Sequence, residues 1–498
     1  MTNTLLPTQV TSFIDGRWRA PTGEAIPVVS PVTEQRISVL HEADAAQVAD
    51  AVAAARRAFE SGAWSRAAVA ERRQVLLRVR DGILAQRERL AHLEVAHTGS
   101  PLSQALGRHI PRAALNFEFF AEFISQASSP LFDQHPDYLT FVRHEPVGVA
   151  GLIAPWNAPL ALATMKVAGA IAFGNSCVLK PSELTPLSFV PLMEILKSAG
   201  VPDGVVNLVN GRGPVTGSAL VGHPDVRVVA FTGGTATGRL IGEAAGRGLK
   251  KVVTELGGKS ANIIFADADL ERALDAALVA IFSNNGQQCL AGSRILLQRP
   301  VAEEFTARFV ERARALRIGD PFDTRTELGP LISAVQRERV LSFADMARRT
   351  TGVEVLCGGR AATRSPGYFV EPTVVRAASN SLPVCREEIF GPFATLLVFD
   401  EAEEAFAMAN DSEFGLVSYV WSGSLATVMA AMNALRAGVV WVNTPLTREL
   451  RAPFGGYKNS GVGRDGGIWS RALFTEEKTV TIPVRDFPIQ RLGLDGGD

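Results

Sequence analysis

The chain has 498 residues, and its 50 Lys and Arg residues nearly balance its 51 Asp and Glu residues, for a formal net charge of −1 at pH 7. This balance gives no electrostatic basis for binding nucleic acid or an anionic membrane surface. The length suggests about three domains. The four cysteines have neither metal-ligand spacing nor the density of a disulfide framework. We therefore expect no metal site, and free thiols in a reducing compartment.

Two observations favour a cytoplasmic protein. The first residues lack the basic and apolar regions of a secretion signal. The most apolar stretch, 147–174, is interrupted by Pro155, Asn157, Pro159 and Lys166, whereas a membrane span needs about 20 apolar residues with few polar breaks. We expect a soluble chain with no membrane partner.

The first quarter of the chain is predicted to be mainly helical. Segments 45–59 and 69–98 carry apolar residues at helical spacing, with Arg and Glu on the opposite face. The segment 138–143 is rich in β-forming residues and follows a turn-like segment at 128–130, which predicts a strand.

From residue 147 onward, short apolar runs alternate with helical stretches, which predicts an α/β fold with parallel sheets covered by helices on both faces. A helix over 270–283 leads the chain to Cys289. The tail 479–484 alternates like a strand with one covered face. The strands of the α/β region are predicted at 149–154, 176–179, 205–209, 228–231, 262–265, 294–298, 396–399 and 438–442.

Cys289 is the only cysteine placed among Gly, Gln, Asn and Ser residues. Such surroundings let the backbone fold tightly around a sulfur and let a substrate reach it. A thiol becomes a strong nucleophile when it ionises, so we expect nearby dipoles or charges to lower its pKa from about 8.5. The alternative is a structural cysteine, because a free cysteine usually behaves as a small hydrophobic residue.

The motifs that accompany Cys289 resemble those of the NAD(P)-dependent aldehyde dehydrogenase superfamily. The resemblance runs from about residue 12 to about residue 485, and the motifs stand in the family's order and spacing. The segments that carry it are 153–160, 178–183, 231–238, 254–259, 282–294, 387–392 and 453–461.

The resemblance implies two related doubly wound α/β domains and a small β oligomerisation arm. The NAD-binding domain would comprise 1–127 and 147–258, and the catalytic domain 259–460. The arm would comprise 128–146 and 474–498. Because exposed strand edges need covering, the arm would pair with another subunit in a homodimer or homotetramer.

The resemblance implies a catalytic role for Cys289, Asn157 and Glu255. Cys289 would attack the aldehyde carbon, and the side-chain amide of Asn157 with the backbone N–H of Cys289 would stabilise the oxyanion. After hydride transfer to NAD, Glu255 would act as the general base that lets water hydrolyse the thioester. Its setting suggests a raised pKa. A turn residue at 157 and a solvated carboxylate at 255 are the alternatives.

Gly233, Gly234 and Gly238 follow an apolar run at the start of an expected helix, where backbone N–H groups suit phosphates. Their spacing is not the G-x-G-x-x-G fingerprint, and an ordinary β–α turn is the alternative. The family often has Ser where this chain has Gly234. Lys180 and Glu183 resemble the pair that binds the adenosine ribose, and a carboxylate there favours NAD over NADP.

Four further residues match cofactor-binding positions of the family. Trp156 and Leu256 would line the cofactor cleft, and Glu388 and Phe390 would hold the nicotinamide ribose and ring. A core tryptophan and a solvated glutamate are the alternatives. The family's usual Glu after the 460–464 segment is replaced by Asp465, so a second proton-relay role for this carboxylate is not assigned.

Arg112 and Arg448 match positions that line the family's aldehyde tunnel, where many relatives have apolar side chains. A guanidinium offers a planar fork for a carboxylate. These segments resemble the 2-hydroxymuconic and 5-carboxymethyl-2-hydroxymuconate semialdehyde dehydrogenases, which implies an anionic semialdehyde as substrate. The alternative is a pair of structural salt bridges to Glu118 and Glu449.

Three other functions compete with a non-acylating semialdehyde dehydrogenase. The enzyme could oxidise neutral aromatic or aliphatic aldehydes, or it could transfer the acyl group to CoA, although a base at Glu255 argues for water. The fold could also persist without turnover in a binding or structural protein. A plain cysteine hydrolase would need a suitably placed His, which the motifs do not provide.

Overall fold

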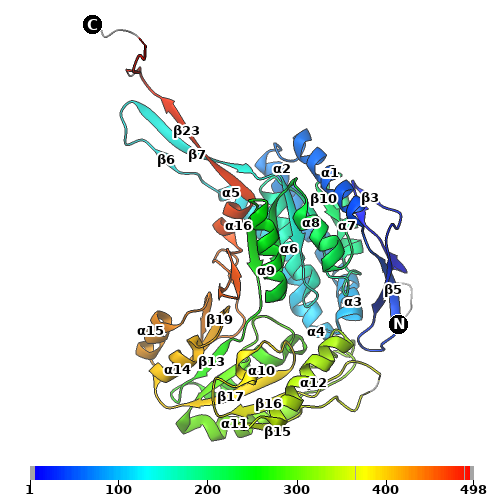
Figure 1. The fold of residues 1–498 in the computed structure, drawn as a ribbon, viewed down its shortest axis with the longest axis vertical. Coiled ribbons are helices and arrows are strands. Elements are labelled where there is room, and N and C mark those ends of the chain that lie inside the picture. The colour runs from blue at the N-terminus through cyan, green and yellow to red at the C-terminus, as the bar shows by residue number, and fades with distance from the viewer. Residues whose placement is uncertain (1–5, 365, 487, 494–498) are drawn as a thin grey trace.

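The computed structural model describes residues 6–364, 366–486 and 488–493. Two α/β units, each built on its own sheet, lie one above the other in Figure 1, and a long β arm projects away from them. Among the described helices, none combines the length and the apolar character needed to cross a membrane.

The first sheet has eight strands in the order β22-β12-β11-β8-β9-β10-β2-β3, and its five central strands are parallel. Its strands are β2 (Phe13–Ile14), β3 (Arg17–Trp18), β8 (Val149–Ile153), β9 (Ser176–Lys180), β10 (Val206–Leu208), β11 (Val226–Thr232), β12 (Lys251–Glu255) and β22 (Gly461–Val462).

Helices cover both faces of this sheet, because alternate residues of its strands point to opposite sides. On β8, Ala150 and Leu152 join the core of one face, and Val149 and Ile153 join the core of the other. Helices α2 (Val69–Ala85), α3 (Arg87–Thr98), α5 (Ile110–Gln126), α6 (Pro159–Ala172) and α7 (Phe189–Ser198) cover the first face, and α1 (Ala45–Ser61), α8 (Ser218–Gly222) and α9 (Thr235–Arg247) cover the second.

The second sheet has seven strands in the order β15-β16-β17-β14-β13-β19-β20, and all pairs except β15–β16 are parallel. Its strands are β13 (Ala261–Ile264), β14 (Arg294–Gln298), β15 (Val353–Cys357), β16 (Thr373–Ala377), β17 (Phe393–Phe399), β19 (Val417–Trp421) and β20 (Val439–Val442). Its helices are α10 (Leu270–Phe282), α11 (Arg299–Arg314), α12 (Ala334–Arg349), α13 (Pro383–Arg386), α14 (Ala402–Asn410) and α15 (Leu425–Ala434).

The arm pairs two segments that are distant in the sequence. Strand β7 (Tyr138–Pro146) runs antiparallel to β23 (Thr475–Pro483) over nine residues each, and β6 (Leu131–Phe132) covers the other edge of β7. The two predicted arm segments therefore pair with each other within one chain (Figure 1). Residues 487 and 494–498 of the predicted arm lie outside the described residues.

Two features add to the sequence-based expectations. The segment 69–98, expected to be helical, forms two helices, α2 and α3, because Gln86 leaves the helical conformation with φ −105° and ψ 19°. The chain also begins with a small sheet of order β1-β5-β4, which packs its own apolar cluster. These strands are β1 (Gln9–Val10), β4 (Ala25–Val29) and β5 (Arg36–His41).

Between α3 and α5, the short helix α4 (Leu102–Gln104) continues into a π-helical turn, η1 (Ala105–His109). The chain closes with α16 (Gly467–Phe474), which leads directly into β23. Single π-turns such as η1 are frequent at functional sites.

Candidate active site

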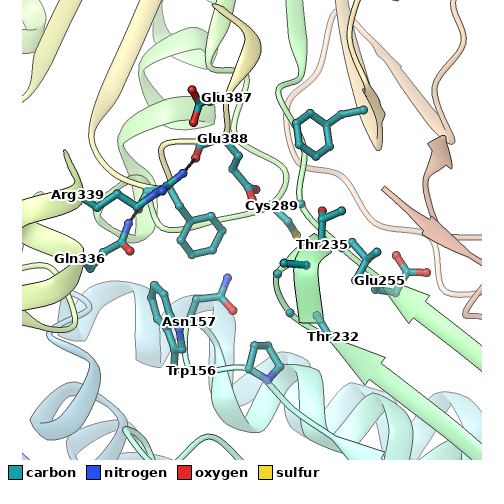
Figure 2. A pocket seen from close by; sticks show the side chains of 18 of the residues that line it. Trp156, Asn157, Thr232, Thr235, Glu255, Cys289, Gln336, Arg339, Glu387 and Glu388 are labelled. Carbon is teal, nitrogen blue, oxygen red and sulfur yellow. Dashed lines mark hydrogen bonds between the residues drawn. The ribbon is translucent and has the colours of Figure 1, made fainter. Parts of the chain in front are cut away.

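Two hollows meet at Cys289. The larger has a volume of about 590 Å³, the smaller about 170 Å³, and both are lined by Asn157, Thr232, Glu255 and Cys289. Figure 2 shows the sulfur of Cys289 between Glu388 and Glu255, with Asn157 and Trp156 across the cavity. A molecule in one hollow can therefore meet a molecule in the other only at this sulfur and its neighbours.

The polar residues before Cys289 shape its turn. In the 3₁₀ turn η3 (Ser283–Gly286), Asn284 and Asn285 have φ of 53° and 58°, a left-handed conformation that Asn tolerates better than most residues. The buried amide of Asn285 donates to the carbonyls of Gly99 and Pro330 and accepts from the N–H of Gly329. These side chains are therefore structural supports for the turn that presents the sulfur.

Asn157 is held toward Cys289 by this same turn. Its Nδ2 donates to the Gln287 carbonyl at 2.9 Å, and its own carbonyl accepts from Asn284 Nδ2 at 2.8 Å. An amide nitrogen carries two hydrogens. One is used in the bond to Gln287, and the second remains to donate to an oxyanion beside the sulfur.

Burial and, to a lesser extent, the carboxylates of Glu388 and Glu255 raise the pKa of the Cys289 thiol to about 12, although the backbone N–H groups of Cys289 and Leu290 act in the opposite direction. The expectation of a lowered pKa was therefore wrong for the free protein. Although the side chain is only half-buried, protein surrounds the sulfur and excludes the water that would stabilise a thiolate. The thiol rests protonated and needs a proton acceptor when it attacks.

Glu255 ends β12 and is buried, and neither of its carboxylate oxygens has a hydrogen-bond partner among the described residues. Burial raises its pKa well above 4.5, the Asp465 charge raises it further, and Lys166 opposes both. The direction agrees with the sequence-based expectation, and the main cause is desolvation. Lys166 Nζ lies 3.7 Å from Asp465 Oδ2, so Asp465 belongs to the charged surroundings of Glu255.

The larger hollow contains a helix N-terminus. Gly234 is the N-cap of α9 and provides no side-chain hydrogen bond, so the first N–H groups of this helix are free to bind an anion. A Cβ added at Gly234 would meet nothing within 4 Å. Gly238 instead packs against the side chain of Leu256, where a Cβ would lie 2.5 Å from Cδ2, and it does not line the hollow. The turn at Gly233 and Gly234 therefore offers open space and free N–H groups to an anionic group.

Glu388 and Phe390 line the same hollow, and side chains of α12 hold the loop that carries them. Glu388 Oε1 accepts from the N–H of Gly258 at 3.0 Å, and the Phe390 ring meets Trp156 edge to face with centroids 5.2 Å apart. Gln336 Nε2 donates to the Phe390 carbonyl at 2.8 Å, and Arg339 donates to the Glu388 carbonyl at 2.6 Å. Figure 2 shows Gln336 and Arg339 beside this loop.

Lys180 and Glu183 come together at the end of β9, with 3.9 Å between Nζ and Oε2. Lys180 is buried and donates to the Pro181 carbonyl at 2.8 Å, while Glu183 stays half-exposed. Neither residue is among those that line the larger hollow around Cys289. Their role toward an adenosine ribose stays a prediction.

Arg112 and Arg448 both line the smaller hollow. The expected salt-bridge alternatives are not formed, because Glu118 pairs with Arg80 at 3.1 Å and Glu449 pairs with Arg451 at 2.8 Å. Arg112 Nε donates to Asn116 Oδ1 at 2.9 Å, which leaves its terminal N–H groups facing the hollow. The Arg448 guanidinium lies over the Phe454 ring, 3.9 Å from its centroid.

Sequence reasoning missed several residues of the site. Arg108 joins the two arginines in the smaller hollow, and Lys166 lies beside Glu255. Lys166 could have been noticed in the sequence, since it is the one charged residue of the apolar helix α6. No pattern in the sequence marks Gln336 and Arg339, because they donate hydrogen bonds to loop carbonyls that are far away in the sequence.

Replacing Asn157 by alanine is expected to lower kcat for aldehyde oxidation by roughly 10²–10³-fold, because one preorganised oxyanion donor is lost. Steady-state kinetics with a saturating aldehyde measures this effect. The variant also loses the bond to Gln287, so a thermal unfolding curve must accompany it. A kcat within about three-fold of the parent would remove Asn157 from the catalytic set.

Known proteins resemble this chain over nearly its whole length. Residues 18–480 match the aldehyde dehydrogenase family. The chain is 41% identical to 2-hydroxymuconic semialdehyde dehydrogenase of Pseudomonas sp. (strain CF600), over 95% of this chain and 99% of the relative. It is also 41% identical to retinal dehydrogenase 2 of Gallus gallus, over 95% and 91% of the two chains. An aldehyde dehydrogenase of Bacillus cereus, solved in complex with NAD+, superimposes with a TM-score of 0.94 at 40% identity, covering 97% of this chain and 98% of that one.

Proposed function

The chain belongs to the aldehyde dehydrogenase family, and from this premise we propose that it is a non-acylating, NAD-dependent enzyme whose aldehyde substrate carries a carboxylate. The observation that carries the proposal is the meeting of two hollows at Cys289, one with a helix N-terminus and the other with arginines. An aldehyde reaches the sulfur from the arginine side, and the dinucleotide reaches it from the helix side.

The reaction begins when the Cys289 sulfur bonds to the aldehyde carbon and the thiol proton leaves. Solvent takes this proton. The Glu255 carboxylate lines both hollows and has no hydrogen-bond partner among the described residues, so it stays available for the later hydrolysis. The carbonyl oxygen becomes an oxyanion, which Asn157 Nδ2 and the Cys289 N–H stabilise. NAD held at the N-terminus of α9 and beside Glu388 and Phe390 would supply the hydride acceptor, and a thioester would remain on Cys289.

Water then attacks the thioester carbon, and the acid leaves as the sulfur regains its thiol form. Glu255 accepts a proton from this water, and its raised pKa makes it a stronger base than an exposed carboxylate. The base beside the sulfur supports hydrolysis over transfer to CoA. Separating the acid product from an acyl-CoA in the presence of CoA tests this assignment.

NAD is proposed over NADP because of Glu183. A carboxylate near the adenosine ribose accepts hydrogen bonds from a 2′-hydroxyl and repels a 2′-phosphate. The Lys180 ammonium lies 3.9 Å from this carboxylate, and both groups would form hydrogen bonds with the ribose hydroxyls. The Bacillus cereus structure noted above holds NAD+, which supports the same choice.

A semialdehyde substrate is proposed from Arg112 and Arg448. The two guanidinium groups line the smaller hollow, and neither forms an ion pair within 4.0 Å with a carboxylate among the described residues. A cation buried without a partner is costly, so a substrate carboxylate would stabilise both. The names of two relatives, the 2-hydroxymuconic and 2-aminomuconic 6-semialdehyde dehydrogenases of Pseudomonas, describe substrates of this kind.

Replacing Arg448 by alanine is expected to raise KM for a carboxylated aldehyde by roughly 10–100-fold, and that of a neutral aldehyde of similar size by less than about three-fold, because a charge-assisted hydrogen bond is lost. The matched control is Arg451→Ala, a nearby arginine that is exposed and paired with Glu449. An equal rise in KM for both aldehydes would overturn the carboxylate clamp.

We further propose a cytoplasmic homodimer or homotetramer assembled through the arm. Apolar side chains of Leu131, Phe132 and Ile482 are 56%, 49% and 47% exposed on the arm, which is more apolar surface than an isolated ribbon tolerates well. Light scattering on the intact chain and on a Phe132→Glu variant would test whether the arm holds the assembly together.

A further inference from the structure

A buried glutamate that the mechanism does not use lies beside the start of α6. Glu94 is on α3 and is fully buried. Its Oε1 accepts from the N–H of Leu160 at 2.9 Å and from the hydroxyl of Ser188 at 3.3 Å. Burying a carboxyl group costs free energy unless the group forms hydrogen bonds, so these two bonds hold the side chain in place. The carboxyl group thus joins α3 to the first turn of α6.

The first turn of α6 has no capping side chain of its own. Its N-cap is Ala158, whose methyl group cannot accept a hydrogen bond, and Pro159 at the first helical position has no N–H. The N–H of Leu160 is among the groups at a helix start that have no acceptor within the helix. Glu94 therefore supplies from α3 the acceptor that a Ser or Asp at the N-cap would supply.

The Glu94 carboxyl group acts here as a hydrogen-bond acceptor and not as a member of an ion pair. Its Oε2 has no hydrogen-bond partner among the described residues, and His109 Nδ1 lies 3.8 Å from it. Burial and the charge of Arg108 lower the pKa of His109 to about 4, so this ring is neutral. Burial raises the pKa of Glu94 to about 7, against the lowering effect of the hydrogen bonds from Leu160 and Ser188. Oε1 can accept from Leu160 whether or not Oε2 carries a proton.

Only two residues, Ala158 and Pro159, separate Leu160 from Asn157. The proline ring fixes its own φ, so this short connection has little freedom to absorb a displacement of the helix start. The turn before Cys289 holds Asn157 from one side, and the start of α6 holds it from the other. A displacement of the first turn of α6 would therefore move the amide of Asn157 relative to the sulfur, and a misplacement of about 1 Å can cost roughly 10²-fold in rate.

We propose that Glu94 is a positioning residue for the oxyanion donor: by accepting from the N–H of Leu160 it fixes the start of α6, and with it the side-chain amide of Asn157. Glu94 lines neither hollow around Cys289, so it touches neither reactant. The inference rests on the proposed oxyanion role of Asn157 and adds the residue that holds this donor in place. Loss of the acceptor should slow the chemistry without weakening the binding of the aldehyde.

Glu94→Met and Glu94→Gln separate this role from packing. Methionine keeps the length of the side chain and removes the acceptor, whereas glutamine keeps an oxygen for the N–H of Leu160. For Glu94→Met we expect kcat for aldehyde oxidation to fall roughly 10-fold, with KM for the aldehyde within about three-fold of the parent. Glu94→Gln should restore kcat to within about three-fold of the parent. Glu88→Met, at an exposed glutamate on the same helix, is the matched control.

A double variant shows whether Glu94 acts through Asn157. In an Asn157→Ala background, Glu94→Met should lower kcat by less than about two-fold more, because the donor that it positions is already gone. An equal loss of kcat in both backgrounds would show that Glu94 acts independently of Asn157, and the inference fails. If Asn157→Ala lowers kcat and Glu94→Met does not, the inference fails and the oxyanion role stands. If Asn157→Ala itself leaves kcat unchanged, the oxyanion role fails, and the inference fails with it.

Glu94→Asp covers the case in which the methionine variant does not fold. Aspartate keeps a buried carboxyl group and shortens its reach by one methylene, so kcat should fall roughly 3–10-fold with KM for the aldehyde nearly unchanged. Thermal unfolding curves of every variant accompany the kinetics. A lowered Tm together with an unchanged kcat in Glu94→Asp would assign Glu94 to stability alone and overturn the inference.

Discussion

Replacing Cys289 by alanine is expected to lower kcat/KM for aldehyde oxidation by roughly four to six orders of magnitude, because the covalent route is removed while both hollows remain. The measurement is the formation of NADH from a carboxylated aldehyde. Binding of NAD, followed by protein fluorescence, is expected to be retained, because the helix N-terminus and the Glu388 loop do not depend on the sulfur for their position.

Cys357 provides the matched control for this experiment. Its thiol is buried, contacts the Pro372 carbonyl and lines neither hollow around Cys289, so Cys357→Ala should oxidise the aldehyde at close to the parent rate. A Cys289→Ala variant that keeps even a tenth of the parent rate would contradict covalent catalysis at this sulfur.

Replacing Glu255 by glutamine is expected to lower steady-state turnover by roughly 10²–10⁴-fold, because the base for thioester hydrolysis is lost. A rapid burst of NADH, close to one per active site, should precede the slow phase. Intact-mass measurement during the slow phase should show the acyl group attached to the protein. If the burst is lost together with the turnover, Glu255 is required for the attack of Cys289 as well as for hydrolysis.

The dependence of the rate on pH follows from the direction of the Glu255 pKa. Burial and the charge of Asp465 raise this pKa well above 4.5, and only the ionised carboxylate can accept a proton. The steady-state rate should therefore rise with pH through the raised pKa of Glu255, and Glu255→Gln should remove this rise. Because the folded chain holds this proton more tightly than the unfolded chain, ionising Glu255 reduces stability as the pH rises above about 4.5.

Glu255 and Cys289 show where local sequence is informative and where it is not. The motifs around the two residues predicted the turn and the loop that carry them, because the backbone of a β–α turn or a tight loop is encoded by neighbouring Gly, Asn and Pro residues. The direction of the Cys289 pKa was wrong, because desolvation depends on the segments that pack around the sulfur. Those segments include residues such as Glu388, which lies 99 positions away in the chain.

The sequence by itself determined the strand-and-helix alternation, the candidate for the nucleophile and the membership of a family, because periodicity and turn residues act over short distances. For the strands β8 and β14, the predicted and observed bounds agree within one residue. Only the tertiary structure decided which residues lie together in one cavity. It placed Arg108 with Arg448 and Lys166 with Asp465, pairs that are hundreds of residues apart, because their proximity comes from the packing of two sheets and not from any local pattern.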